Sequence, residues 1–393
     1  MHIGAKVIKR GTFHDVFRDI FTALTIDLIG IVAGIILIRG EEAFTRYPWI
    51  MCIYPAILGV RGAINGMICG KISTSLHLGI LEGQEGIFLR RVIIEAALLL
   101  SVTGGMIIGL VGWLVTGSAL SLLADSLTLA ISVMFLATSV LAPLSIALGS
   151  FLFRRGHDPD AVLYPIMSTL SDIFATALYI VVIALYLASP LVVMTLGIMA
   201  SLFALHRLKD LVRNYLSELK EMFIAVLMAI SLESMAGSAL VHFKERVIRS
   251  GMLMIYPVLI DALGDVGSAF GSMATTRLTL GTIEPSLSEL TRLKLEGLAM
   301  YLAFLLLHLI LGLITIITTS HRKGVSLLLS PIVAALAGFP VMAIISYSIA
   351  ILTFKHGLDP DNFVNPLESS IADVVATLCM VLGLFVSRLL YPM

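Results

Sequence analysis

Stretches of about 20 predominantly apolar residues recur along the whole chain. A hydrocarbon core about 30 Å thick requires roughly 20 apolar residues in a helix, and lipid tolerates only helices or closed barrels. The pattern predicts eleven membrane-spanning helices, at about residues 17–38, 48–70, 92–116, 123–153, 162–188, 190–206, 219–242, 251–275, 295–319, 325–354 and 364–387. The composition agrees, because 58% of the residues are hydrophobic and 13% are charged. We therefore expect an all-α polytopic membrane protein.

The charges and cysteines argue against other classes of protein. Lys and Arg number 26 and Asp and Glu number 26, so there is no basic surplus that would favour a nucleic-acid partner. Cys52, Cys69 and Cys379 each stand alone in apolar stretches, which offers neither a disulfide framework nor a zinc cluster. We expect no bound cofactor.

The distribution of positive charge predicts the orientation in the cell membrane. Cytoplasmic loops hold the excess of Lys and Arg. With the N-terminus inside, 17 of the 26 basic residues fall on the cytoplasmic side and eight on the opposite side, while Arg61 lies within a span. We expect a cytoplasmic N-terminus and an extracellular C-terminus. We also expect the first span to be retained and not cleaved as a signal peptide.

An internal repeat divides the chain. Residues 153–176 and 354–377 are displaced by 201 positions and share ten of 24 residues, and segments starting at Tyr54 and Tyr256 repeat at a displacement of 202. We predict a five-helix repeat at 1–189, a connecting helix and linker at 190–218, and a second five-helix repeat at 219–393. Because one helix joins the two units, both should enter the bilayer from the same side, and a shared site should lie on the axis between them.

The fifth helix of each repeat carries an acidic residue inside the membrane. A charge costs about 2.5–3.5 kcal/mol there by insertion scales, so Asp172 and Asp373 need compensating partners. Neighbouring hydroxyl side chains at helical spacing are candidates to line the same surface. They are Ser168, Thr169 and Thr176 in the first copy and Ser369, Ser370 and Thr377 in the second. The duplication favours a functional pair, although satisfaction by structural hydrogen bonds is the alternative.

The second helix of each repeat is rich in glycine. Gly62 and Gly264 belong to these runs, which permit either opened helices that line a wet cavity or close helix packing. Asp261 and Asp265 in the second copy favour the cavity and are candidate metal contacts there, and Asn65 is the nearest polar counterpart in the first. Such a cavity is therefore expected to be electrostatically asymmetric.

Two further acids, Asp27 and Glu233, interrupt the first helix of each repeat. They differ by three positions when Ala33-Gly34 is aligned with Ala236-Gly237, so they share a helix face without being strict equivalents. Two roles are open for these acids. They form either a secondary ion or proton site, used for coupling, or a structural hydrogen bond.

These motifs resemble the membrane domain of MgtE-type magnesium transporters, in the two-repeat form related to solute carrier family 41. The resemblance rests on Pro55, Gly59 and Gly62, followed by Lys71-Ile72-Ser73-Thr74 and Gly79, and on the duplicated pattern DPDxxxxPxxSxxxD. It covers nearly the whole chain. It implies a pore lined by second and fifth helices, with Asp172 and Asp373 holding hydrated Mg²⁺.

We expect a divalent cation transporter, not an enzyme, that carries Mg²⁺ or a related ion. Oxygen ligands and retained water suit Mg²⁺, while Mn²⁺, Co²⁺ and Ca²⁺ stay open. One chain holds both repeats, so a monomer should suffice, with dimerisation through other surfaces open. The alternatives are a Na⁺- or H⁺-coupled exchanger or exporter, a carrier for an organic substrate and, remotely, an intramembrane hydrolase with Asp172 and Asp373 as an aspartyl pair.

Overall fold

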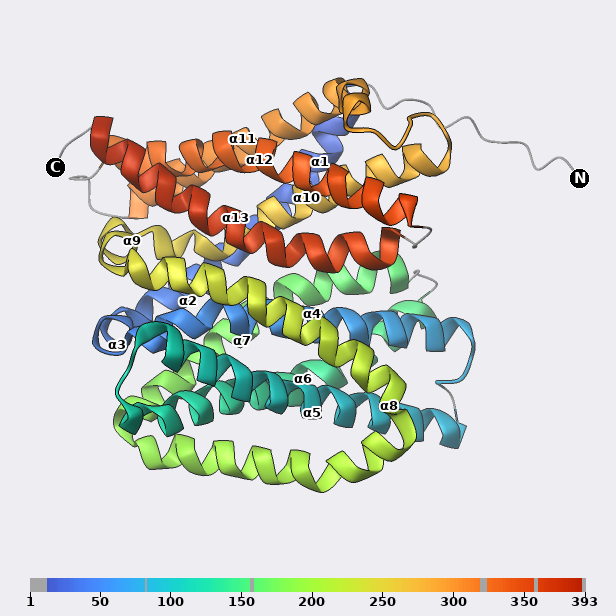
Figure 1. Ribbon diagram of the computed structural model, residues 1–393, viewed down its shortest axis with the longest axis vertical. Coiled ribbons are helices and arrows are strands. Elements are labelled where there is room, and N and C mark those ends of the chain that lie inside the picture. Colours follow the sequence, from blue (N-terminus) through green and yellow to red (C-terminus); the bar gives the residue numbers. More distant parts are fainter. Residues whose placement is uncertain (1–12, 82, 156–158, 319–323, 357–359, 391–393) are drawn as a thin grey trace, which may run out of the picture.

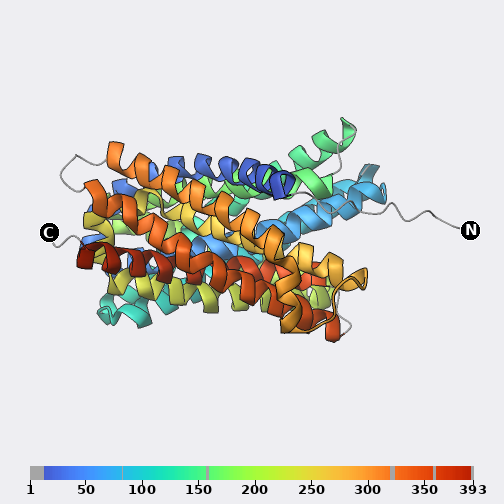
Figure 2. The ribbon, with the colours of Figure 1, turned by 90° about the horizontal axis from the view of Figure 1, so that it is seen from above.

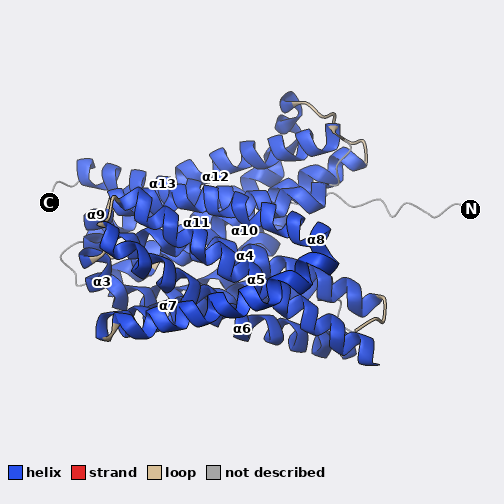
Figure 3. Cartoon of the chain, turned by 60° about the horizontal axis from the view of Figure 1, so that its bottom comes forward, coloured by secondary structure: helices blue, strands red, loops and turns tan. Residues whose placement is uncertain are grey.

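The chain folds as a bundle of long helices. The computed structural model describes residues 13–81, 83–155, 159–318, 324–356 and 360–390. Every regular element within these ranges is a helix (Figure 3). Ten segments there are long and apolar enough to cross a membrane. The one predicted span without a counterpart among these ten, at 251–275, corresponds to α10 (Tyr256–Thr279), whose aspartates and small residues lower its hydropathy.

The first half begins with a broken helix and continues with four long ones. The broken helix comprises α1 (Phe13–Asp27), η1 (Leu28–Gly30), α2 (Ile31–Leu37), η2 (Ile38–Gly40) and α3 (Glu41–Arg46). The long helices are α4 (Pro48–His77), α5 (Gly83–Thr116), α6 (Leu123–Arg154) and α7 (Pro159–Ala188), with η3 (Leu120–Leu122) before α6. The first passage is thus longer than predicted and is interrupted by two turns of 3₁₀ helix.

The second half follows through a single long helix. This helix, α8 (Pro190–His242), is broken at Tyr215, where φ −137° and ψ 32° are not helical. Figure 1 shows its two arms folding back on each other. The remaining elements are α9 (Lys244–Ser250), η4 (Met252–Met254), α10, η5 (Leu287–Leu293), α11 (Lys294–Thr318), α12 (Gly324–Lys355) and α13 (Pro360–Leu390). The first arm of α8 covers the span predicted at 190–206, and the second arm covers the span predicted at 219–242.

The second helices of the two halves end in the same way. Gly79 follows α4 with φ 69°, and Gly281 follows α10 with φ 66°. Their amides donate to the carbonyls of Leu76 and Leu278, both at 3.0 Å. A left-handed residue after a helix is the usual glycine stop. Both glycines are therefore required by the same turn, displaced by 202 positions.

The first helix of each half packs on the other half. The α1 helix contacts α11 and α10 of the second repeat, whereas α8 contacts α4 and α5 of the first. Figure 1 shows α1 among the C-terminal helices and the second arm of α8 among the N-terminal ones, and Figure 2 shows the same bundle of helices from above. One hydrophobic core runs through both halves, from Leu24 to Met380. The repeats thus form one interlocked body.

Two glycines permit this exchange. A Cβ at Gly34 would lie 1.7 Å from the carbonyl oxygen of Met254, and one at Gly237 would lie 2.0 Å from that of Cys52. Any side chain there would separate the helices. Small residues at such crossings let helix backbones approach closely in membranes. The two crossings are equivalent, so they hold the first helix of each half in the same relation to the opposite half.

Candidate cation site

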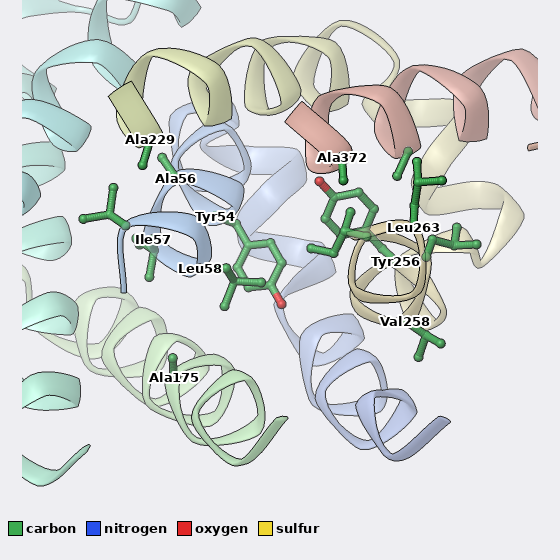
Figure 4. Packing of buried hydrophobic residues seen from close by; sticks show 14 of the residues in the cluster. Tyr54, Ala56, Ile57, Leu58, Ala175, Ala229, Tyr256, Val258, Leu263 and Ala372 are labelled. Atoms are coloured by element: carbon green, nitrogen blue, oxygen red, sulfur yellow. The ribbon is translucent and has the colours of Figure 1, made fainter. Parts of the chain in front are cut away.

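Two tyrosines mark where the halves meet. Tyr54 of α4 hydrogen-bonds Thr176 of α7 at 2.9 Å, and Tyr256 of α10 hydrogen-bonds Thr377 of α13 at 3.0 Å. Their ring centroids lie 6.4 Å apart at an interplanar angle of 48°. Figure 4 shows the two rings on neighbouring helices within the buried core. The second and fifth helices of both halves therefore meet here through equivalent residues.

Asp172 of α7 is buried in an ion pair. Its Oδ1 accepts from Nη2 of Arg61 on α4, and Asp172 and Arg61 are each 4% exposed. Nε and Nη1 of Arg61 have no hydrogen-bond partner in the described part of the chain. A charge inside the membrane demands such a counter-charge. In the sequence, Arg61 is a basic residue inside an apolar span. From this signal its pairing with an acid could have been predicted.

Asp373 of α13 has a different neighbour. It is 7% exposed and lies beside Glu233 on α8, which is fully buried. Neither carboxylate oxygen of Glu233 has a hydrogen-bond partner within the described residues. The Glu233 side chain packs on Gly59, where an added Cβ would lie 2.2 Å from Oε1. Only the first of the two fifth-helix acids is thus paired with an arginine among the described residues.

The aspartates of α10 connect the remaining acids. Asp261 is partly exposed and lies near Asp172, while Asp265 is exposed and lies beside Asp27 of α1. Oδ2 of Asp261 is 3.7 Å from the position of a Cβ at Gly30. We use the term acidic centre for these acids with Arg61: Asp27, Asp172, Glu233, Asp261, Asp265 and Asp373. All six were singled out from the sequence, and the structure brings them together from five helices.

The predicted polar lining divides into groups. Thr176 and Thr377 are fully buried and bonded to the tyrosines, and Thr377 also donates to the carbonyl of Asp373 at 2.6 Å. Asn65 donates to Oγ of Ser171 at 3.4 Å and accepts from Ser145 at 3.0 Å. These three side chains therefore already serve helix packing.

The other predicted lining residues are more open. Ser168 and Thr169 are half-buried, Ser369 is exposed and Ser370 is buried. A Cβ at Gly62 would meet nothing within 4 Å, and one at Gly264 would meet only Cβ of Ala372 at 3.8 Å. Gly62 and Gly264 thus border open space. Asp158 and Asp359, which open the repeated DPD motifs, lie outside the described residues.

The carboxylates of the acidic centre do not form a compact metal-binding cluster within the described residues. Within the described residues no three His, Cys, Asp or Glu side chains converge closely enough to hold a metal ion. Mg²⁺ gives up its water reluctantly and is usually held through few protein ligands. Separated carboxylates, accompanied by serine hydroxyls, can instead contact the water shell of a hydrated ion.

A helical bundle with a buried, largely acidic centre between two repeats belongs to the class of polytopic membrane proteins that handle cations. The family model for the MgtE divalent cation transporter matches residues 54–182 and 256–383, once in each half and over more than half of the chain. The protein therefore belongs to the MgtE family of divalent cation transporters. The match also confirms the two-repeat organisation.

Two other comparisons add little. No curated protein matches the chain. Among solved structures, the crystal structure of the eukaryotic MATE transporter AtDTX14 aligns with 10% identity over 95% of this chain and 98% of that one, at a TM-score of 0.31. A similarity this weak carries no argument about fold or function.

Proposed function

We propose that the protein carries hydrated Mg²⁺ across the cell membrane through the acidic centre between its repeats. The observation that carries this proposal is the charge imbalance of that centre. Six acids approach one another from five helices, and the basic side chain paired with them among the described residues is Arg61. Buried carboxylates must be paired, protonated or bound to cations. A divalent cation would satisfy two of them at once.

The choice of Mg²⁺ rests on the donor set. Within the part of the chain that the structure describes, the centre offers carboxylate oxygens, with serine hydroxyls nearby, and no sulfur or imidazole, which favours hard cations over soft ones. Open space beside Gly62 and the exposure of Asp265 support a wet pathway on the second helices. If Mg²⁺ keeps its water shell, carboxylates that are too far apart to bind the ion directly can still hold it through water.

The orientation follows the positive charges, with the N-terminus in the cytoplasm and the C-terminus outside. Moving two charges down about 100 mV releases roughly 4.6 kcal/mol, at 2.3 kcal/mol per charge. Inward flow through a single chain therefore needs no coupling ion.

A second candidate function, exchange of Mg²⁺ for Na⁺ or H⁺, is favoured by Glu233. Its carboxylate is fully buried and has no hydrogen-bond partner among the described residues. A group in that state is suited to binding a proton or a monovalent ion. It lies beside Asp373, so its occupancy would affect the same centre.

Flux measurements in sealed proteoliposomes test the proposal and separate the two functions. Vesicles containing purified protein and a trapped Mg²⁺ indicator receive external Mg²⁺, with the membrane potential set by K⁺ and valinomycin. We expect uptake that rises with an inside-negative potential and is absent from protein-free vesicles. Uptake that requires an opposing Na⁺ or H⁺ gradient would support the exchanger instead. No uptake of any divalent cation under either condition would contradict both.

A further inference from the structure

The two fifth-helix acids occupy equivalent sequence positions but have unlike partners. Asp172 is paired with Arg61, while Asp373 lies beside Glu233. With the displacement of 202 that relates Tyr54 to Tyr256, the position of Arg61 corresponds to Leu263. The second half therefore has no guanidinium at this place.

The Arg61 guanidinium is held at the centre itself. It is 4% exposed and its contact is with a carboxylate that also lies near Asp261 of the opposite half. Nε and Nη1 have no hydrogen-bond partner in the described part of the chain, so the ion pair leaves two donors unsatisfied. Because arginine stays protonated, its charge cannot be removed by losing a proton. Its positive charge therefore stays beside the acids whenever the cation binds.

We propose that Arg61 acts as a built-in cation that competes with the transported ion for Asp172. This inference rests on the proposed function. With no metal bound, the guanidinium neutralises Asp172, while Asp373 and Glu233 have no basic partner among the described residues. When a divalent cation binds, it draws Asp172 away from Arg61. When the cation is released, the guanidinium returns to Asp172. This competition keeps the affinity for the cation low enough for turnover.

The competition has a distinct signature in binding and flux. Arg61→Leu, which installs the residue of the second half, should lower the apparent Kd for Mg²⁺ at least tenfold and reduce the maximal flux. Arg61→Lys keeps the positive charge and should stay within about threefold of the original protein. Asp172→Asn leaves the guanidinium without its partner and should raise the Kd at least tenfold.

The double variant Arg61→Leu with Asp172→Asn tests the mechanism even if the single variant folds poorly. It removes the competitor together with the group competed for, so neither member of the Arg61–Asp172 pair is left buried without the other. Its Kd should lie within about threefold of the original protein. A tightening equal to that of Arg61→Leu would show that Asp172 is not the group competed for and would overturn the proposal.

Binding is measured by titrating MgCl₂ into detergent-purified protein by calorimetry at constant Na⁺, with flux measured in parallel. If the original protein binds and transports Mg²⁺ but Arg61→Leu binds equally or more weakly, the arginine is structural and this inference fails alone. If the original protein shows neither binding nor flux for Mg²⁺, the proposed function fails as well.

Discussion

The carboxylate of Glu233 packs directly on Gly59, so that a Cβ there would lie 2.2 Å from Oε1. The equivalent crossing in the other half has the reverse arrangement. There the acid is Asp261, at the position equivalent to Gly59, and it faces Gly30, at the position equivalent to Glu233. Each crossing thus brings one carboxylate to the centre and provides one glycine to make room for it. The acids are distributed differently between the halves, but both crossings contribute one.

This packing predicts opposite effects of alanine at two neighbouring glycines. Gly59→Ala forces the Glu233 carboxyl to move and should destabilise the protein by about 1–3 kcal/mol, as overpacking does. Gly62→Ala is the matched control, because its Cβ would meet nothing within 4 Å. It should leave the melting temperature unchanged or raised, since alanine is the better helix former. Equal melting temperatures for both variants in detergent would contradict the packing.

The two fifth-helix acids should differ in their effect on stability. Asp172→Asn leaves Arg61 buried without its partner, which should destabilise the fold by about 3–5 kcal/mol. Asp373→Asn removes one of two neighbouring acids and should leave the melting temperature equal or higher. Both should reduce Mg²⁺ flux at least tenfold. Thermal unfolding of the purified variants in Mg²⁺-free buffer checks the first claim, and an equal loss of stability in both would refute it.

Asp265 and Asn65 should separate ion binding from packing. Asp265 is exposed, so Asp265→Asn should weaken divalent affinity or selectivity while leaving the melting temperature unchanged. Asn65 bonds Ser171 and Ser145, so Asn65→Ala should cost about 1–3 kcal/mol of stability with a smaller effect on affinity. Mg²⁺ titrations and melting curves provide both readouts. Negligible effects of both substitutions on Mg²⁺ binding and flux would confine the cation site to the fifth helices.

Glu233→Gln tests the coupled alternative. The amide keeps the size of the side chain but cannot carry or release a proton as a carboxylate does. A uniport mechanism predicts Mg²⁺ uptake that keeps its dependence on membrane potential in this variant. Loss of a response to an imposed Na⁺ or pH gradient, together with retained Mg²⁺ binding, would instead assign Glu233 to coupling.

Much of the fold and the composition of the centre could be predicted from the sequence, because both depend on local signals. Apolar length gave the helices, and acids inside apolar spans are conspicuous, so Asp27, Glu233 and Asp373 could each be found alone. The repeat gave the pairing of Asp172 with Asp373 as equivalents.

The contacts between helices could not be predicted in this way. The pairing of Arg61 with Asp172 joins residues 111 positions apart, and only tertiary structure shows that the guanidinium reaches that acid. The packing of α1 and α8 on opposite halves depends on close backbone approach at Gly34 and Gly237. A glycine in a membrane helix is compatible with several roles, and the sequence did not decide among them. The partners of each acid in the centre, and so the asymmetry between the two halves, are therefore known only from the structure.

The most direct test of a cation pathway between the repeats is to locate the bound cation in a crystal. Crystals grown with Mn²⁺ as a substitute for Mg²⁺ would show it by anomalous scattering. The account predicts a peak inside the acidic centre, about 4–5 Å from a carboxylate oxygen of Asp373, the distance expected when one water lies between ion and carboxylate. The peak should vanish in Asp373→Asn crystals. Anomalous peaks confined to the surface of the protein, in crystals of protein that transports Mn²⁺, would contradict a cation pathway between the repeats.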